Sequence, residues 1–104
     1  MSEIVELTTT LETQDQAESI AKSIVESRLA ACVQIAAIHS VYRWKNETCS
    51  GAEFRCSFKT TLQVLPKLKA ALMTQHPYEL PELVTSSLEC SPEYQTWVES
   101  QVES

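Results

Sequence analysis

Glycine, positive charge and long apolar runs are all scarce in this sequence of 104 residues. Glycine occurs once, at Gly51, and only 8 lysines and arginines stand against 14 aspartates and glutamates. A net charge of −6 argues against a partner that is recognised through a phosphate backbone. No apolar run approaches the roughly 20 residues that a membrane-spanning helix needs. Because the first residues also lack the basic and apolar regions of a secretory signal, we expect a cytoplasmic protein with no nucleic-acid or membrane partner.

Paired cysteines of the C-x-x-C type, which mark common zinc and redox sites, are also missing. The chain has four cysteines, which are Cys32, Cys49, Cys56 and Cys90. In a reducing compartment we expect four free thiols, some of them buried as small apolar side chains.

The length suits one domain spanning residues 1–104. β-branched residues predict a first strand over 4–10, and Thr13 with Gln16 forms the capping box of a following helix. Apolar residues of this helix recur at the spacing of one buried face, namely Ala17, Ile20, Ala21, Ile24 and Val25. Polar residues between them, including Arg28, are expected to face solvent.

A long β-hairpin from about residue 31 to residue 61 is the central expected feature. In its first strand, the apolar residues Val33 and Ile35 lie on one face, whereas Tyr42 and Trp44 lie on the other. This change of face predicts a bulge near residues 36–39. Turn-forming residues span 46–51. The returning strand over 52–62 alternates cleanly, with one apolar face made by Phe54, Cys56 and Phe58.

The remaining segments complete a familiar element order. A second helix is predicted over 64–75, with Pro66 in its first turn, where a proline costs no hydrogen bond. Two prolines make 76–82 an ordered loop, and 83–89 is typical of a fourth strand. Ser91 begins a last helix with an apolar stripe of Tyr94, Trp97, Val98 and Val102. The order β-α-β-β-α-β, then α, predicts an α+β ferredoxin-like sandwich with both main helices on one face of an antiparallel sheet.

The hairpin is too long for this helix layer to cover. Strands of about 14 residues at roughly 3.3 Å each span about 45 Å, whereas a helix of about 15 residues spans about 22 Å. The outer half, which carries Tyr42 and Trp44, should therefore project from the body. Exposed strand edges and aromatic side chains favour closed self-association, in which the hairpin of one copy extends the sheet of the next.

Several motifs resemble the CutA divalent-cation-tolerance family over essentially the whole chain. They are TTT at 8–10, RLAACV at 28–33, SVYRW at 40–44, Glu53, KT at 59–60, HPYELPE at 76–82 and YQTW at 94–97. The resemblance implies a ferredoxin-like homotrimer, similar in architecture to the PII signalling proteins. It also implies binding of copper or other divalent metal ions and a part in the response to metal ions.

Candidate metal ligands lie in the HPYELPE segment. His76, Glu79 and Glu82 offer one imidazole and two carboxylates, a donor set suited to Cu(II) or a similar ion. The alternative is that His76 only ends the helix and that the two prolines only shape the turn. Some family members have a cysteine linked to copper binding in the first loop, where this sequence has Thr9, so tight copper binding is less expected here.

A second hypothesis is a sensor or scaffold that binds a small ligand or a protein partner in clefts between subunits. Aromatic and charged residues would line such a cleft together with Glu79 and Glu82, namely Tyr42, Trp44, Glu53, Lys59 and Tyr78. The alternative is that Glu53 and Lys59 pair across subunits and that the aromatic rings fill the interface.

Catalysis is not expected from this sequence. The loop after the first strand contains neither glycine nor arginine, so it is poorly suited to cradle a phosphate group. His39 lies in the expected bend of the hairpin, and no Ser-His-Asp or Cys-His set is indicated. We therefore expect a binding protein and not an enzyme.

Overall fold

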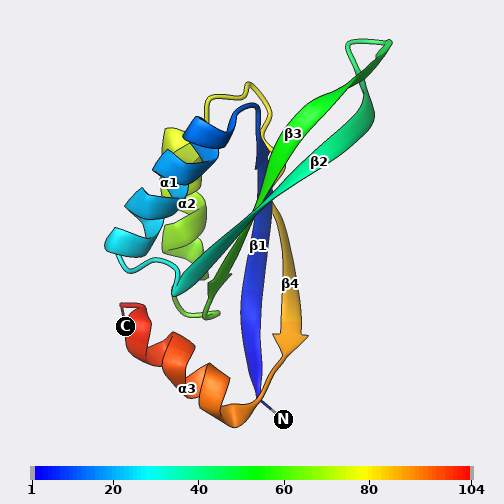
Figure 1. Ribbon diagram of the computed structural model, residues 1–104. Helices are drawn as coiled ribbons and strands as arrows, with labels where there is room; N and C mark the ends of the chain where they lie inside the picture. The colour runs from blue at the N-terminus through cyan, green and yellow to red at the C-terminus, as the bar shows by residue number, and fades with distance from the viewer. Residues whose placement is uncertain (1, 104) are drawn as a thin grey trace.

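The computed structural model describes residues 2–103 as a four-stranded sheet with helices on one face (Figure 1). The elements are β1 (Glu3–Leu11), α1 (Gln14–Glu26), β2 (Cys32–Trp44), β3 (Glu47–Thr60), α2 (Leu65–Gln75), β4 (Val84–Glu89) and α3 (Pro92–Gln101). The strand order is β2-β3-β1-β4, and each neighbouring pair is antiparallel. The predicted α+β ferredoxin-like arrangement is therefore confirmed. Within the described residues, no helix is long and apolar enough to cross a membrane.

Helix α1 begins with the predicted capping box. The Gln16 N–H donates to Thr13 Oγ1 at 3.1 Å, and the Thr13 N–H donates to Gln16 Oε1 at 3.3 Å. The predicted buried face is correct for Ala17, Ile20, Ala21 and Ile24. It is wrong for Val25, which is 39% exposed. Each residue turns the helix by about 100°, so the neighbour of Ile24 lies beyond the edge of the buried stripe.

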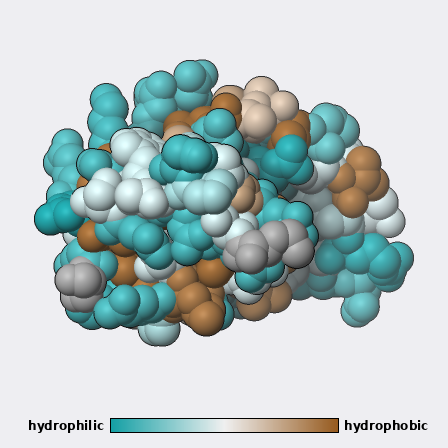
Figure 2. Space-filling model, turned by 90° about the horizontal axis from the view of Figure 1, so that it is seen from below, coloured by the Kyte–Doolittle hydropathy of each residue, from teal (hydrophilic) through white to brown (hydrophobic). Residues whose placement is uncertain are grey.

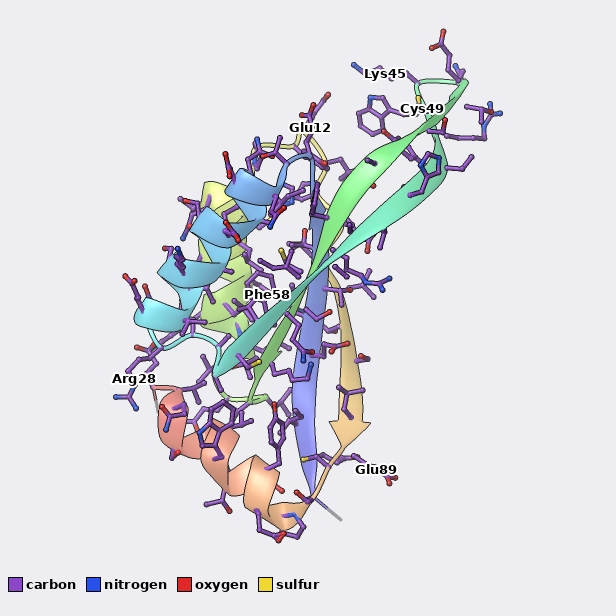
Figure 3. The ribbon with its side chains drawn as sticks, viewed as in Figure 1. Glu12, Arg28, Lys45, Cys49, Phe58 and Glu89 are labelled. Atoms are coloured by element: carbon purple, nitrogen blue, oxygen red, sulfur yellow. The ribbon has the colours of Figure 1, made fainter. Side chains whose placement is uncertain are left out.

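The core lies between the sheet and the pair α1 and α2. Cys56 and Phe58 of β3 are fully buried there, against Leu7 of β1 and Leu68 and Leu72 of α2. Figure 3 places Phe58 between the strands and the helices. The alternation predicted for the returning strand of the hairpin is thus confirmed, because its apolar face meets the helix layer.

The hairpin differs from its prediction in register and in turn. Strand β2 pairs with β3 without interruption, from Cys32 opposite Lys59 to Trp44 opposite Glu47, so the bulge predicted at 36–39 is wrong. The turn is also shorter than the predicted 46–51. Lys45 and Asn46 alone form it, with φ values of 50° and 67°. Positive φ at both central residues is typical of a two-residue hairpin turn of type I′.

The change of apolar face has a different cause from a bulge. Val33 and Ile35 of the inner half of β2 pack against the core. The outer half extends beyond the helices (Figure 1), so no helix layer dictates which of its faces is apolar. Tyr42 and Trp44 therefore occupy the other face of an unbroken strand, where they are 49% and 37% exposed. The predicted projection of the hairpin is confirmed.

Helices α2 and α3 start as predicted. Pro66 lies in the first turn of α2, and the Oγ atom of Ser91 caps α3. Val98 and Val102 of the predicted stripe are buried, whereas Trp97 is 42% exposed. Figure 2 views the end of the molecule opposite the hairpin tip, where apolar and polar side chains are interspersed on the surface.

Arg28 holds the end of α3, although its position in the sequence predicted a solvated side chain. Its Nε donates to the carbonyl of Gln101 at 3.0 Å, and one terminal nitrogen lies 3.1 Å from the carbonyl of Ser100 and 3.4 Å from that of Val102. In return, the N–H of Glu103 donates to the Arg28 carbonyl at 2.9 Å. The last carbonyls of a helix lack partners within it, so the guanidinium caps α3.

Candidate functional site

A cleft of about 800 Å³ lies where the hairpin leaves the body of the molecule. Its walls come from the end of β1, the outer part of β2 and β3, and the loop between α2 and β4. In Figure 3, Glu12 lies at the end of β1 beside this loop, and Lys45 lies farther out at the hairpin tip. Tyr42, Trp44 and Glu53 project into this region from the face of the hairpin that is opposite the core side chains of β3.

Aromatic and acidic side chains dominate this cleft. The aromatic residues that line it are Tyr42, Trp44 and Tyr78. The charged residues that line it are all glutamates, namely Glu12, Glu53, Glu79 and Glu82. No lysine, arginine or histidine of residues 2–103 lines the cleft. The structure thus brings together six of the seven residues expected from the sequence to line a ligand cleft, namely Tyr42, Trp44, Glu53, Tyr78, Glu79 and Glu82.

Tyr78 ties the loop to the hairpin. Its hydroxyl donates a hydrogen bond of 2.9 Å to Oε2 of Glu53. Burial raises the pKa of Tyr78 above its ordinary value, and the hydrogen bond to Glu53 and the negative charges of Glu53 and Glu12 raise it further. The phenol therefore stays protonated at neutral pH and keeps donating this hydrogen bond.

His76 fixes the start of the same loop with both nitrogens of its ring. Nε2 lies 2.9 Å from the carbonyl oxygen of Thr10 and 3.0 Å from Oγ1 of Thr9, and Nδ1 accepts the N–H of Tyr78 at 3.2 Å. Because a carbonyl only accepts, Nε2 carries the hydrogen and the imidazole is neutral. Burial lowers the pKa of His76, despite the opposing effects of the Thr10 carbonyl and of Glu53.

The predicted metal ligands do not gather in one copy of the chain. Glu79 and Glu82 are exposed at the cleft, but both nitrogens of His76 are already hydrogen-bonded elsewhere. In the part of the chain that the structure describes, no three His, Cys, Asp or Glu side chains form a group that could hold a metal ion. The residues of a single copy therefore do not fit a three-ligand metal site.

Lys59 lies away from the cleft, on the same face of β3 as Glu53 but six residues farther along. Its ammonium group is 2.7 Å from Oε1 of Gln34 and 3.2 Å from Oε2 of Glu6. This partly buried ion pair with Glu6 already neutralises Lys59 within its own chain. Within one copy of the chain, Lys59 is thus separate from the other six residues that were expected to line a ligand cleft.

The remaining candidate residues, which are Thr9, the four cysteines and His39, lie outside the cleft. Thr9 is fully buried, with its hydroxyl against His76. The four cysteines are free thiols, as expected, and burial raises the pKa of Cys56 to about 11. Cys32 is half-buried opposite Lys59 in the hairpin register. His39, which was expected in a bend, is an exposed residue of a continuous strand opposite Ala52.

Sequence reasoning missed the position of one ammonium group beside the cleft. Nζ of Lys45 lies 5.7 Å from the centroid of the Trp44 ring and 3.7 Å from Oε2 of Glu79. The Trp44-Lys45 pair at the hairpin turn was the available signal, but Glu79 is 34 positions farther along the chain. Only the folding of the loop onto the hairpin brings the three together.

Comparisons with known proteins agree on one family. Residues 5–101 match the family model described as CutA1 divalent ion tolerance protein. A Thermus thermophilus protein named divalent-cation tolerance protein CutA is 40% identical over 100 residues, which are 94% of this chain and 95% of the relative. The solved structure of CutA from Synechococcus elongatus has a TM-score of 0.92 at 37% identity and covers 99% of this chain and 93% of its own. A structure described as the PII-like protein CutA from Nostoc has a TM-score of 0.89 at 35% identity, covering 96% and 97% of the two chains.

Proposed function

The chain belongs to the CutA1 divalent ion tolerance family, and from this premise we propose that it serves in tolerance of, and response to, divalent metal ions such as copper. It acts as a homotrimer of one-domain subunits, binds its ligand without catalysing a reaction, and works in the cytoplasm. The reducing cytoplasm suits a protein whose four cysteines are free thiols.

The uncovered outer hairpin is the observation that supports the assembly. Val41, Tyr42 and Trp44 are 68%, 49% and 37% exposed on it, an unusual apolar load for a free strand pair. Strands β2 and β4 form the two opposite edges of the sheet, so β2 of one copy can extend the sheet of the next at β4. Head-to-tail contacts of this kind form a closed ring when the rotation between copies closes, and a filament when it does not. The family resemblance implies a ring of three.

Sedimentation and native mass spectrometry test the assembly. We expect the purified protein to have three times the chain mass of 11.7 kDa, with or without a chelator. A Trp44→Lys substitution should shift the protein toward monomers, because it places a charge on the part of the hairpin that a neighbouring copy covers in the proposed trimer. Trp97→Lys is the matched control, since Trp97 is 42% exposed but lies on α3. A wild-type monomer, or a Trp44→Lys variant that remains trimeric, would refute the proposed assembly.

In this proposal the metal ion is the ligand that the protein binds, and the carboxylates of Glu79 and Glu82 are the candidate metal ligands. One copy offers no three-ligand group within residues 2–103, so neighbouring copies or water complete the coordination. His76 takes part only by giving up one of its two hydrogen-bonding roles. Calorimetric titration with Cu(II) separates these parts. We expect weaker binding by Glu79→Gln with Glu82→Gln. His76→Ala leaves the affinity unchanged if the ring only holds the loop and weakens it if His76 is a ligand.

The cleft supports a second candidate function, which is a PII-like sensor or scaffold. Three aromatic rings around a cleft of about 800 Å³ supply the apolar surface of a small-ligand site, and four carboxylates supply its polar groups. The proposed occupant is a small ligand or a segment of a partner protein at the subunit boundary. Native mass spectrometry of the purified trimer tests this function by showing whether a ligand is retained, and loss of that ligand in a Tyr78→Ala variant would assign it to the cleft.

A further inference from the structure

The cleft at the base of the hairpin has the chemistry of a site for positive charge. All four of its charged lining residues are glutamates. Aromatic rings line the same cleft, and the face of an aromatic ring attracts an ammonium group. An anion such as a nucleotide would meet four carboxylates on the walls, where no basic side chain of residues 2–103 lines the cleft.

The protein itself places an alkylammonium group at the edge of this cleft. Nζ of Lys45 lies 5.7 Å from the centroid of the Trp44 ring and 3.7 Å from Oε2 of Glu79. The side chains of Lys45 and Glu79 are 71% and 74% exposed, so this ion pair contributes little and is easily displaced. Lys45 therefore shows where a primary ammonium group can lie. Because its ion pair is weak, the ammonium group of a ligand can replace it.

The placement of the carboxylates on separate walls favours an extended cation over a metal ion. No three His, Cys, Asp or Glu side chains of residues 2–103 converge as a metal ion requires. The glutamates come instead from separate walls of the cleft, with Glu12 just after β1, Glu53 on β3 and Glu79 in the loop after α2. A cation with two charges joined by a hydrocarbon chain suits carboxylates on separate walls, and the rings of Tyr42 and Trp44 offer apolar surface for the methylene groups.

We propose that this cleft binds an aliphatic diamine or polyamine, with one ammonium group replacing that of Lys45 between Trp44 and Glu79 and a second reaching Glu12 or Glu53. The inference rests on the second candidate function, ligand binding in the cleft, and names the chemical class of the ligand. All of these residues belong to one chain, and in the proposed trimer a neighbouring copy borders the same cleft.

Calorimetric titration of the intact protein with 1,4-diaminobutane at an ionic strength of about 0.02 M tests the proposal, since exposed charges are least screened there. Butane-1,4-diol has the same chain without charge, and 1-aminobutane has one charge. We expect the diamine to bind most tightly, 1-aminobutane more weakly and the diol not at all. Binding of the diol as tight as that of the diamine would overturn the proposal, as would no binding of the diamine.

Variants assign the binding to the cleft. Glu79→Gln should weaken diamine binding about 2- to 5-fold, the effect of one exposed ion pair, and the double variant with Glu12→Gln about tenfold. Lys45→Met should tighten it about 2- to 5-fold, because the internal competitor is removed. Glu89→Gln on β4 is the matched control, since Glu89 lies at the opposite end of the sheet (Figure 3), and should leave binding unchanged. Equal affinity of all four variants would overturn the proposal.

Different outcomes would refute the proposed assembly and the proposed class of ligand. A trimer that binds Cu(II) but no diamine would retain the proposed metal-tolerance function and refute this inference. A monomer that binds the diamine in a Glu79-dependent way would support this inference and refute the proposed assembly. Glu79 is 74% exposed, so its replacement leaves the fold intact and keeps the test informative.

Discussion

The hydroxyl of Tyr78 donates a hydrogen bond of 2.9 Å to Oε2 of Glu53, and through it the loop after α2 is joined to the outer hairpin. The two residues are 25 positions apart and belong to different walls of the cleft. At the start of the loop, His76 is bound to the end of β1. The cleft therefore keeps its shape through two contacts that join one loop to two different strands.

Removal of the Tyr78 hydroxyl tests how much this contact contributes. We expect Tyr78→Phe to lower the free energy of unfolding by about 1 kcal/mol, the typical net value of one partly exposed hydrogen bond. Amide hydrogen exchange should become faster in residues 77–83 and stay unchanged in α1. Tyr94→Phe on α3 is the matched control. Equal exchange in the two variants would show that the Tyr78 hydroxyl does not hold the loop.

The neutral ring of His76 makes stability depend on pH in a defined direction. Its pKa in the folded protein is below the ordinary value of 6.5, mainly through burial. The unfolded chain therefore takes up this proton more readily, so the stabilisation is complete above 6.5 and is lost as the pH falls from 6.5 through the lowered pKa.

Urea denaturation at fixed protein concentration, at pH 7.5 and pH 5.5, measures this effect in the wild type and in His76→Gln. We expect the wild type to lose more stability between the two pH values than the variant, whose amide does not titrate. His39→Gln, at an exposed position of β2, should behave as the wild type. The same pH dependence in His76→Gln would exclude His76 as its source.

The guanidinium of Arg28 should contribute measurably because it serves three carbonyls at the end of α3. Arg28→Ala is expected to lower the free energy of unfolding by about 1–3 kcal/mol, the range for hydrogen bonds to a charged group. Arg28→Gly should cost less than Arg28→Ala, since the backbone has φ 61°, where glycine lacks the steric penalty of alanine.

Urea denaturation at fixed protein concentration also measures these changes, with Lys22→Ala at an exposed position of α1 as the control. A loss in Arg28→Ala no larger than that of the control would show that the bonds to α3 contribute nothing. An Arg28→Gly variant less stable than Arg28→Ala would contradict the argument from the left-handed backbone.

The cysteines should differ in reactivity. Cys56 is fully buried and its pKa is raised to about 11, so at pH 8 it is neither accessible nor ionised. We expect iodoacetamide to modify the half-buried Cys90 in the native protein and to reach Cys56 only after denaturation. Peptide mass spectrometry measures both sites in one digest. Modification of Cys56 at the rate of Cys90 in native protein would contradict the packing of β3.

Local patterns in the sequence were sufficient for most elements. The capping box of Thr13 and Gln16, the early proline of α2 and the alternation along β3 all depend on residues within one turn or strand of each other. The uncovered hairpin followed from length alone, because a strand rises about 3.3 Å per residue and a helix only 1.5 Å. These features were predicted correctly because neighbouring residues determine them.

Two incorrect predictions concern the hairpin, one through a distant layer and one through the local turn. The change of apolar face in β2 looked like a bulge, but it marks where the helix layer ends, and a helix layer is not visible in the sequence of the strand. The turn at Lys45 and Asn46 has positive φ without a glycine, and the only glycine lies within β3.

The sequence by itself determined the order of elements, the ferredoxin-like topology, the projecting hairpin and the set of chemically interesting side chains. Only the tertiary structure decided which of those side chains meet. It bound both nitrogens of His76, kept the carboxylates from converging on one point, and placed Lys45 between Trp44 and Glu79. Backbone propensities act over a few residues, whereas a site is made by contacts between residues far apart in the chain, and these exist only once the loop after α2 has folded onto the hairpin.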